Sequence, residues 1–148
     1  MSGDLPGAVL FCCTMNAVRS VMAEALMKRL FGHAVYIDSV GVRPGDVNSI
    51  AVAIMDEIGI DITRHRSKSF NDLDDDSFDL IISLSPESHH SAVEMTRTMA
   101  CEVEFWNTFD PTYVVGNRVV RLEAFRQVRD NLMMRIKNRF GSPPPPMV

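Results

Sequence analysis

Short apolar runs alternate with amphipathic segments along this 148-residue chain, and the alternation limits the folds that it can adopt. Each apolar run has the length and composition of a buried strand, and each is followed by apolar residues at helical spacing. The predicted strands are residues 8–12, 35–40, 78–84 and 101–106, and the predicted helices are residues 18–30, 50–58, 86–99 and 120–140. Such a series predicts an α/β fold, with a parallel sheet, right-handed crossovers and helices on both faces.

Glycine and proline support these boundaries. Gly59 and Gly141 follow predicted helices, and Pro86 occupies the first turn of another. At 148 residues and 46% hydrophobic content, the chain is long enough to bury one core without disulfides or a structural metal. We therefore predict one domain over residues 1–141 and a proline-rich tail over residues 142–148, which we expect to be disordered.

Composition argues against several functional classes. The formal net charge of −4 argues against nucleic-acid binding through a general basic surface, and no apolar stretch reaches the length of a membrane span. The three cysteines are odd in number and two are adjacent, which does not suit a disulfide framework. Since no secretory signal pattern opens the sequence, we expect a cytoplasmic protein without a membrane partner.

The first predicted strand passes into the first predicted helix through the sequence C-C-T-M-N-A-V-R-S. Backbone N–H groups at such a turn, together with the positive end of a helix, can bind an anion. Cys13 would be a nucleophile there, because a helix N-terminus and a nearby cation stabilise a thiolate. The Arg19 guanidinium suits two oxygens of a tetrahedral oxyanion. Ser20 can donate to the thiolate, and Asn16 tolerates a left-handed conformation.

These residues predict attack on a bound phosphate. A cysteine and an arginine at this interval are a weak signal alone, and the alternative is a buried thiol beside a surface arginine. The strand-to-helix context favours the catalytic interpretation.

Phosphate transfer through a cysteine also needs a proton donor for the leaving oxygen. Asp110 precedes Pro111 and follows the last predicted strand, at the same edge of the sheet as Cys13. We predict that Asp110 is the general acid. The alternative is an aspartate that only opens a turn before proline.

The chain resembles the low-molecular-weight protein tyrosine phosphatases, whose fold is shared with thioredoxin-coupled arsenate reductases. The similarity rests on the loop C-T-M-N-A-V-R-S, on S-V-G at residues 39–41, on G-I-D at residues 59–61 with His65, and on Asp110-Pro111. It implies a three-layer αβα fold with a four-stranded parallel sheet, and a phosphocysteine on Cys13. Asp110 would protonate the leaving group and then activate water, and no metal or organic cofactor is implied.

The predicted substrate-binding residues lie in the phosphate loop and around it. They are Thr14, Met15, Asn16, Ala17, Val18, Ser20, Arg43 and Tyr113. The basic residues Arg43, Arg64, Arg66 and Lys68 could rim the pocket and attract acidic peptides, with Arg43 as the best candidate. The favoured alternative is that they are only solvated, as arginines in polar loops usually are.

The chain departs from the family pattern inside the phosphate loop. Met15 stands where glycine is usual, so we expect a side chain at a turn that prefers glycine and a narrower pocket. Val18 replaces a cysteine that could form a protective disulfide. Cys12 is too close to Cys13 for a disulfide and is expected to be a buried core thiol. Thr112 replaces one of two tyrosines, which removes one aromatic wall of the pocket.

Three functions remain open. The favoured one is hydrolysis of a phosphomonoester, phosphotyrosine in a protein above all, with inorganic phosphate or another oxyanion as ligand. The second is arsenate reduction with an external thiol, because residues 84–88 lack a relay cysteine and Cys101 is expected to pack. The third is a non-catalytic oxyanion-binding protein, if Met15 distorts the loop or Asp110 lies too far from the bound ligand.

Overall fold

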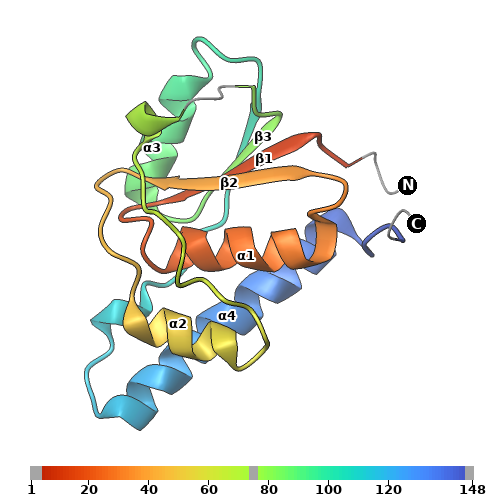
Figure 1. The fold of residues 1–148 in the computed structure, drawn as a ribbon. Coiled ribbons are helices and arrows are strands. Elements are labelled where there is room, and N and C mark those ends of the chain that lie inside the picture. The colour runs from red at the N-terminus through yellow and green to blue at the C-terminus, as the bar shows by residue number, and fades with distance from the viewer. Residues whose placement is uncertain (1–4, 74–76, 146–148) are drawn as a thin grey trace.

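The computed structural model describes residues 5–73 and 77–145, and strands and helices alternate along them (Figure 1). The elements are β1 (Ala8–Cys13), α1 (Arg19–Phe31), β2 (Tyr36–Gly41), α2 (Ser49–Asp56), the 3-10 helix η1 (Phe70–Asp72), β3 (Leu80–Ser83), α3 (Pro86–Met95), β4 (Glu102–Phe105), the 3-10 helix η2 (Pro111–Tyr113) and α4 (Arg118–Phe140). The strands form one four-stranded sheet in the order β2-β1-β3-β4, and every pairing is parallel. The predicted α/β fold is confirmed.

Helices cover both faces of the sheet, so the three-layer arrangement is also confirmed. Helices α1 and α4 lie side by side against one face with α2 beside them, and α3 lies on the other face (Figure 1). Strand β1 is buried along its whole length and contributes to both cores. Its alternation sends Phe11 and Cys13 into the core of α1, α2 and α4, and Leu10 and Cys12 into the core of α3.

Element boundaries differ from the predictions where local hydrogen bonds compete with the periodic pattern. Helix α3 ends at Met95 rather than at residue 99, and the Thr96 hydroxyl donates to the Val93 carbonyl at 2.6 Å. Threonine favours such local bonds over helix continuation. Helix α4 begins earlier than predicted, since the Asn117 side chain caps it by accepting from the Val120 amide at 3.0 Å.

The carboxyl ends of the strands meet at one edge of the sheet, and the loops that follow them are bonded to one another. The chain after β2 runs along the phosphate loop: the Arg43 amide donates to the Thr14 carbonyl at 2.8 Å, and the Gly45 amide to the Met15 carbonyl at 2.9 Å. After β4, the Thr108 amide donates to the Leu84 carbonyl at 2.9 Å. This edge is where ligands bind in open α/β sheets.

The proline-rich tail lies only partly within the described part of the chain. His33 Nε2 donates to the Pro144 carbonyl at 2.9 Å, and residues 146–148 lie outside the described residues. Among the helices of residues 5–73 and 77–145, none combines the length and the apolar character needed to cross a membrane.

Candidate active site

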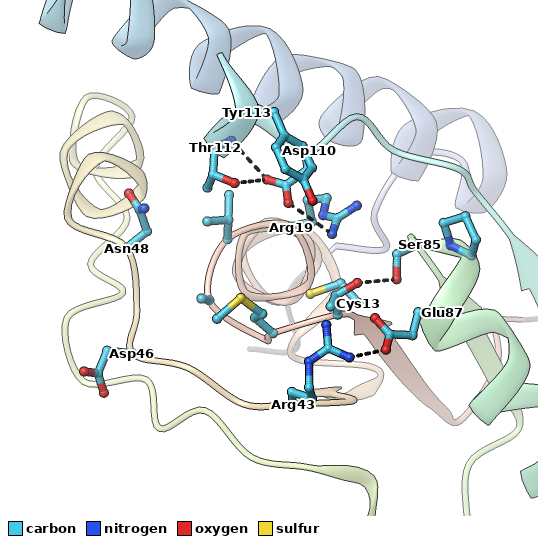
Figure 2. A pocket seen from close by; sticks show the side chains of 15 residues that line it. Cys13, Arg19, Arg43, Asp46, Asn48, Ser85, Glu87, Asp110, Thr112 and Tyr113 are labelled. Atoms are coloured by element: carbon cyan, nitrogen blue, oxygen red, sulfur yellow. Dashed lines mark hydrogen bonds and ion pairs between the residues drawn. The ribbon is translucent and has the colours of Figure 1, made fainter. Parts of the chain in front are cut away.

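A cleft of about 690 Å³ opens at the carboxyl edge of the sheet, with Cys13 at its base (Figure 2). Its walls come from four loops, each of which follows a strand. They are formed by Cys13, Thr14, Met15, Ala17, Val18 and Arg19; by Arg43, Asp46 and Asn48; by Ser85, Pro86 and Glu87; and by Asp110, Thr112 and Tyr113. The cleft therefore brings together the predicted nucleophile, the predicted arginine and the predicted acid.

The Cys13 sulfur sits in a polar cradle, and the residue is only 2% exposed. Its Sγ lies 2.9 Å from Ser20 Oγ and accepts from the Asn16 amide at 3.3 Å. Helix α1 begins at Arg19, and Val18 at its N-cap makes no side-chain capping bond. The amides of the first turn therefore remain available to an oxyanion beside the sulfur.

Arg19 and Asp110 lie next to each other in the cleft. Arg19 Nη1 donates to the Thr108 carbonyl at 3.0 Å, and Nη2 lies 3.6 Å from Asp110 Oδ2. The other carboxylate oxygen, Oδ1, accepts from the Thr112 amide at 3.0 Å and from its hydroxyl at 2.7 Å. Because Oδ1 is occupied in this way, Oδ2 is the oxygen left to exchange a proton with a ligand in the cleft.

Asn16 has a positive φ of 51° in the phosphate loop. Both the nitrogen and the oxygen of its side-chain amide make hydrogen bonds. Nδ2 donates to Ser20 Oγ at 2.8 Å and to Ser39 Oγ at 2.9 Å. Oδ1 accepts from His65 Nε2 at 3.0 Å and from the Lys68 amide at 3.1 Å. These bonds use both donors and both acceptor positions of the amide, which fixes the left-handed turn.

A second layer of polar contacts holds the partners of Asn16. The Ser39 hydroxyl donates to Glu24 Oε1, and that oxygen lies 3.7 Å from His65 Nδ1. Burial lowers the pKa of the His65 imidazole, so the ring is neutral at neutral pH. Since Asn16 Oδ1 accepts, His65 Nε2 carries the ring proton. His65 therefore acts behind the loop and not on a ligand.

The predicted loop residues divide into two groups. Thr14, Met15, Ala17 and Val18 line the cleft as predicted, whereas the side chains of Asn16 and Ser20 lie beneath the loop, fully buried. Asn16 and Ser20 therefore support the loop, and their side chains form no part of the cleft wall.

Met15 does not take the conformation for which glycine is favoured, because the left-handed residue is Asn16. Its side chain lies at the rim of the cleft and is 49% exposed. The expected strain at Met15 is absent from the described loop. The observation that motivated a non-catalytic binding protein is thereby removed.

The other two cysteines lie away from the reacting sulfur. Cys12 Sγ is directed toward the α3 face, 3.8 Å from the Ile82 carbonyl and 3.9 Å from the Ser88 carbonyl. Burial raises the pKa of the Cys12 thiol, so it stays protonated. Cys101 immediately precedes β4, at the edge of the sheet opposite the cleft. The prediction of a buried core thiol at Cys12 is confirmed.

Of the four basic residues considered as a rim, Arg43 lines the cleft within the described residues, and its guanidinium is paired with Glu87. Lys68 instead pairs with Asp38 at 2.7 Å, and Arg66 lines a separate cavity beside His65. Tyr113 is in the cleft wall as predicted and is 78% exposed.

Five residues of the cleft wall were not predicted from the sequence: Asp46, Asn48, Ser85, Pro86 and Glu87. Ser85 to Glu87 follow β3, so the rule that ligands bind at the carboxyl ends of strands could have found them. Asp46 and Asn48 follow β2 by several residues and carry no such local signal.

Comparison with known proteins agrees with this geometry. The family model described as low molecular weight phosphotyrosine protein phosphatase matches residues 8–138, so the chain belongs to this family. It is 32% identical to a glutaredoxin arsenate reductase from Synechocystis sp., over 88% of this chain and 93% of that protein. A solved arsenate reductase in the phosphate-binding state matches with a TM-score of 0.70 and 30% identity, covering 88% of this chain and 94% of that one.

A tyrosine phosphatase from Erwinia amylovora shares the fold, with a TM-score of 0.73 at 18% identity and 94% coverage of both chains. Family membership and the Cys13 cleft place the chain in a class of cysteine-based phosphatases and arsenate reductases.

We predict that Gly41→Ala disturbs the phosphate loop. A Cβ at Gly41 would lie 2.6 Å from the Asn16 nitrogen and 2.7 Å from the Met15 carbonyl carbon, both of them backbone atoms. Relieving such contacts costs about 1–3 kcal/mol of unfolding free energy. Urea denaturation should show this loss of unfolding free energy. A separate phosphate titration should show weaker binding.

Gly141→Ala is the control for this prediction. Nothing lies within 4 Å of the position that a Cβ would take at Gly141, so its cost comes only from the positive φ of 80°. This variant should lose some stability and bind phosphate as tightly as the unmodified protein. A Gly41→Ala protein with unchanged phosphate binding would contradict the prediction.

We predict that the Thr112 hydroxyl positions Asp110. Thr112→Val removes the 2.7 Å bond to Oδ1 and should lower kcat by about tenfold, because a misplaced acid transfers its proton less efficiently. Thr112→Ser keeps the hydroxyl and should retain most of the activity. Substrates with good leaving groups need less protonation and should be less affected. An equal loss with every leaving group would argue against this role.

Proposed function

We propose that this protein hydrolyses phosphomonoesters, and phosphotyrosine in proteins in particular, through a phosphocysteine intermediate. The Cys13 thiolate attacks phosphorus while Asp110 donates its proton to the departing oxygen. Water then attacks the phosphocysteine, Asp110 takes a proton from it, and inorganic phosphate and the thiolate are released. Arg19 and the loop amides bind the phosphoryl oxygens throughout.

One observation favours hydrolysis over reduction: within the described residues, the cleft is lined by a single thiol. Reduction by an internal relay needs a second cysteine able to reach Cys13 and carry oxidising equivalents away. The neighbouring thiol of Cys12 faces the opposite core, and a serine, Ser85, stands in the wall after β3. Asp110, by contrast, lies in the cleft beside Arg19, and its Oδ2 faces the Arg19 guanidinium at 3.6 Å without a hydrogen bond from the described residues.

Tyr113 supports an aromatic ester as the substrate. Its ring is exposed in the wall of the cleft that has Cys13 at its base (Figure 2). The ring can contact the face of a phosphorylated aromatic ring. Thr112 supplies no aromatic wall, but it holds Asp110. Substrate recognition therefore relies on one aromatic contact.

Hydrolysis of p-nitrophenyl phosphate tests the assignment of Cys13, Arg19 and Asp110. Cys13→Ser should lower kcat by about a thousandfold or more, because it removes the nucleophile. Arg19→Ala and Asp110→Asn should each lower it by about a hundredfold or more. Glu94→Gln, in the last turn of α3 and outside the cleft wall, is the matched control. Full activity in Cys13→Ser would overturn the mechanism.

Arsenate reduction is the second candidate, favoured by the similarity to a glutaredoxin arsenate reductase. The same cradle can bind arsenate, which is also a tetrahedral oxyanion. In this reaction the Cys13 sulfur would displace one oxygen of arsenate, which leaves as water, to form a thiol–arsenate adduct. An external thiol would then attack the Cys13 sulfur of the adduct. Arsenite would be released with a mixed disulfide on Cys13, and a second external thiol would restore the enzyme.

A paired assay separates the two candidates. The same preparation is given p-nitrophenyl phosphate, and separately arsenate with either thioredoxin or glutathione and glutaredoxin, and phosphate and arsenite are measured. We expect phosphate release with little arsenite. Robust arsenite formation without ester hydrolysis would overturn the proposed function. Arsenite formation with glutaredoxin but not with thioredoxin would assign the external-thiol route.

A further inference from the structure

The charged side chains of the cleft wall are predominantly acidic, although the ligand is an anion. Three carboxylates, on Asp46, Glu87 and Asp110, line the cleft with only two guanidiniums, on Arg19 and Arg43. Arg19 is buried and lies beside Asp110, so its charge is directed at the phosphoryl position. The charge that a substrate meets outside the cradle is therefore set by Arg43, Asp46 and Glu87.

Arg43 is held in place and paired at the mouth of the cleft. Its amide donates to the Thr14 carbonyl at 2.8 Å, which attaches it to the phosphate loop. Its guanidinium contacts the Glu87 carboxylate, which projects from the first turn of α3 (Figure 2). The N-cap of that helix, Ser85, accepts from Thr14 Oγ1 at 3.1 Å. The pair thus joins two segments that are both bonded to Thr14.

Asp46 adds an unpaired negative charge to the same mouth. It is exposed, and it has no hydrogen-bond or ion-pair partner within residues 5–73 and 77–145. In Figure 2 its carboxylate is directed away from Cys13. Because Glu87 neutralises Arg43, the net charge of the mouth is negative.

We propose that Glu87 and Asp46 determine substrate specificity: they disfavour acidic groups beside the phosphorylated residue and favour basic ones. The proposal rests on the proposed function in that a phosphorylated side chain occupies the cradle. It is opposite in sign to the attraction for acidic peptides that was considered for Arg43. Solvent-exposed charge pairs change affinity by about twofold to fivefold each, and salt weakens them.

The test measures binding to the Cys13→Ser protein, which needs no turnover. Two phosphotyrosine peptides of equal length carry either arginine or glutamate on both sides of the phosphotyrosine, and fluorescence anisotropy gives Kd at low and high salt. At low salt, we expect the Kd of the arginine peptide to be lower than that of the glutamate peptide by about fivefold or more. At high salt, the difference should be smaller. Inorganic phosphate should displace both peptides.

Variants of opposite charge sign make the test specific. In the Cys13→Ser background, Glu87→Gln and Asp46→Asn should each reduce the preference for the arginine peptide about twofold to fivefold. Arg43→Gln should increase that preference. Glu94→Gln, which removes a carboxylate paired with Arg97 near the other end of α3, should leave the preference unchanged.

Equal binding, preference for the glutamate peptide, or failure of both peptides to bind would overturn the proposal. So would an unchanged preference in Glu87→Gln and Asp46→Asn, provided that circular dichroism shows folded protein. Hydrolysis of p-nitrophenyl phosphate by the unmodified protein is measured separately. A protein that binds with the expected preference but does not hydrolyse the ester would refute the proposed function alone.

Discussion

The left-handed turn at Asn16 is the constraint on which the cleft depends. A non-glycine residue in this conformation is costly, and here the side chain of the same residue offsets the cost by bonding to Ser20, Ser39, His65 and the Lys68 amide. These partners come from α1, from β2 and from the chain that precedes η1. Because all the amide positions are satisfied, the network is rigid and holds the Asn16 amide toward the Cys13 sulfur. The proposed nucleophile, Cys13, is thus positioned by the contacts that Asn16 makes behind the loop.

One carboxylate, that of Asp110, combines a structural role with the proposed chemical one. The sequence suggested two alternatives, an acid catalyst or a turn-opening residue before Pro111. The structure assigns the second role to Oδ1, which caps η2 through Thr112, and leaves Oδ2 beside Arg19. Fixing one oxygen restricts the position of the other. The capping bond is therefore part of what makes Asp110 suitable for the proposed proton transfer.

Prediction from the sequence succeeded where the signal is local. Alternating apolar runs predicted the parallel sheet, and the strand-to-helix turn and the Asp-Pro pair pointed to Cys13, Arg19 and Asp110, which the structure brings into one cleft. The boundary of α3 was wrong because the Thr96 hydroxyl competes for a helix carbonyl. The pairing of Arg43 with Glu87 could not be predicted, since it depends on how loops from two strands meet. The Glu24–His65 contact could not be predicted either, because it joins α1 to a segment far along the chain.

The pleat of β1 places the two adjacent thiols on opposite faces of the sheet. Successive strand residues face opposite sides, so Cys13 enters the cradle while Cys12 enters the α3 core, where burial keeps it protonated. In the proposed reaction, the step that follows attack by Cys13 therefore depends on what reaches it from outside. Water activated by Asp110 would complete a hydrolysis, and an external thiol would complete a reduction. Since Asp110 lies in the cleft and a thiol donor must be recruited, the arrangement favours hydrolysis.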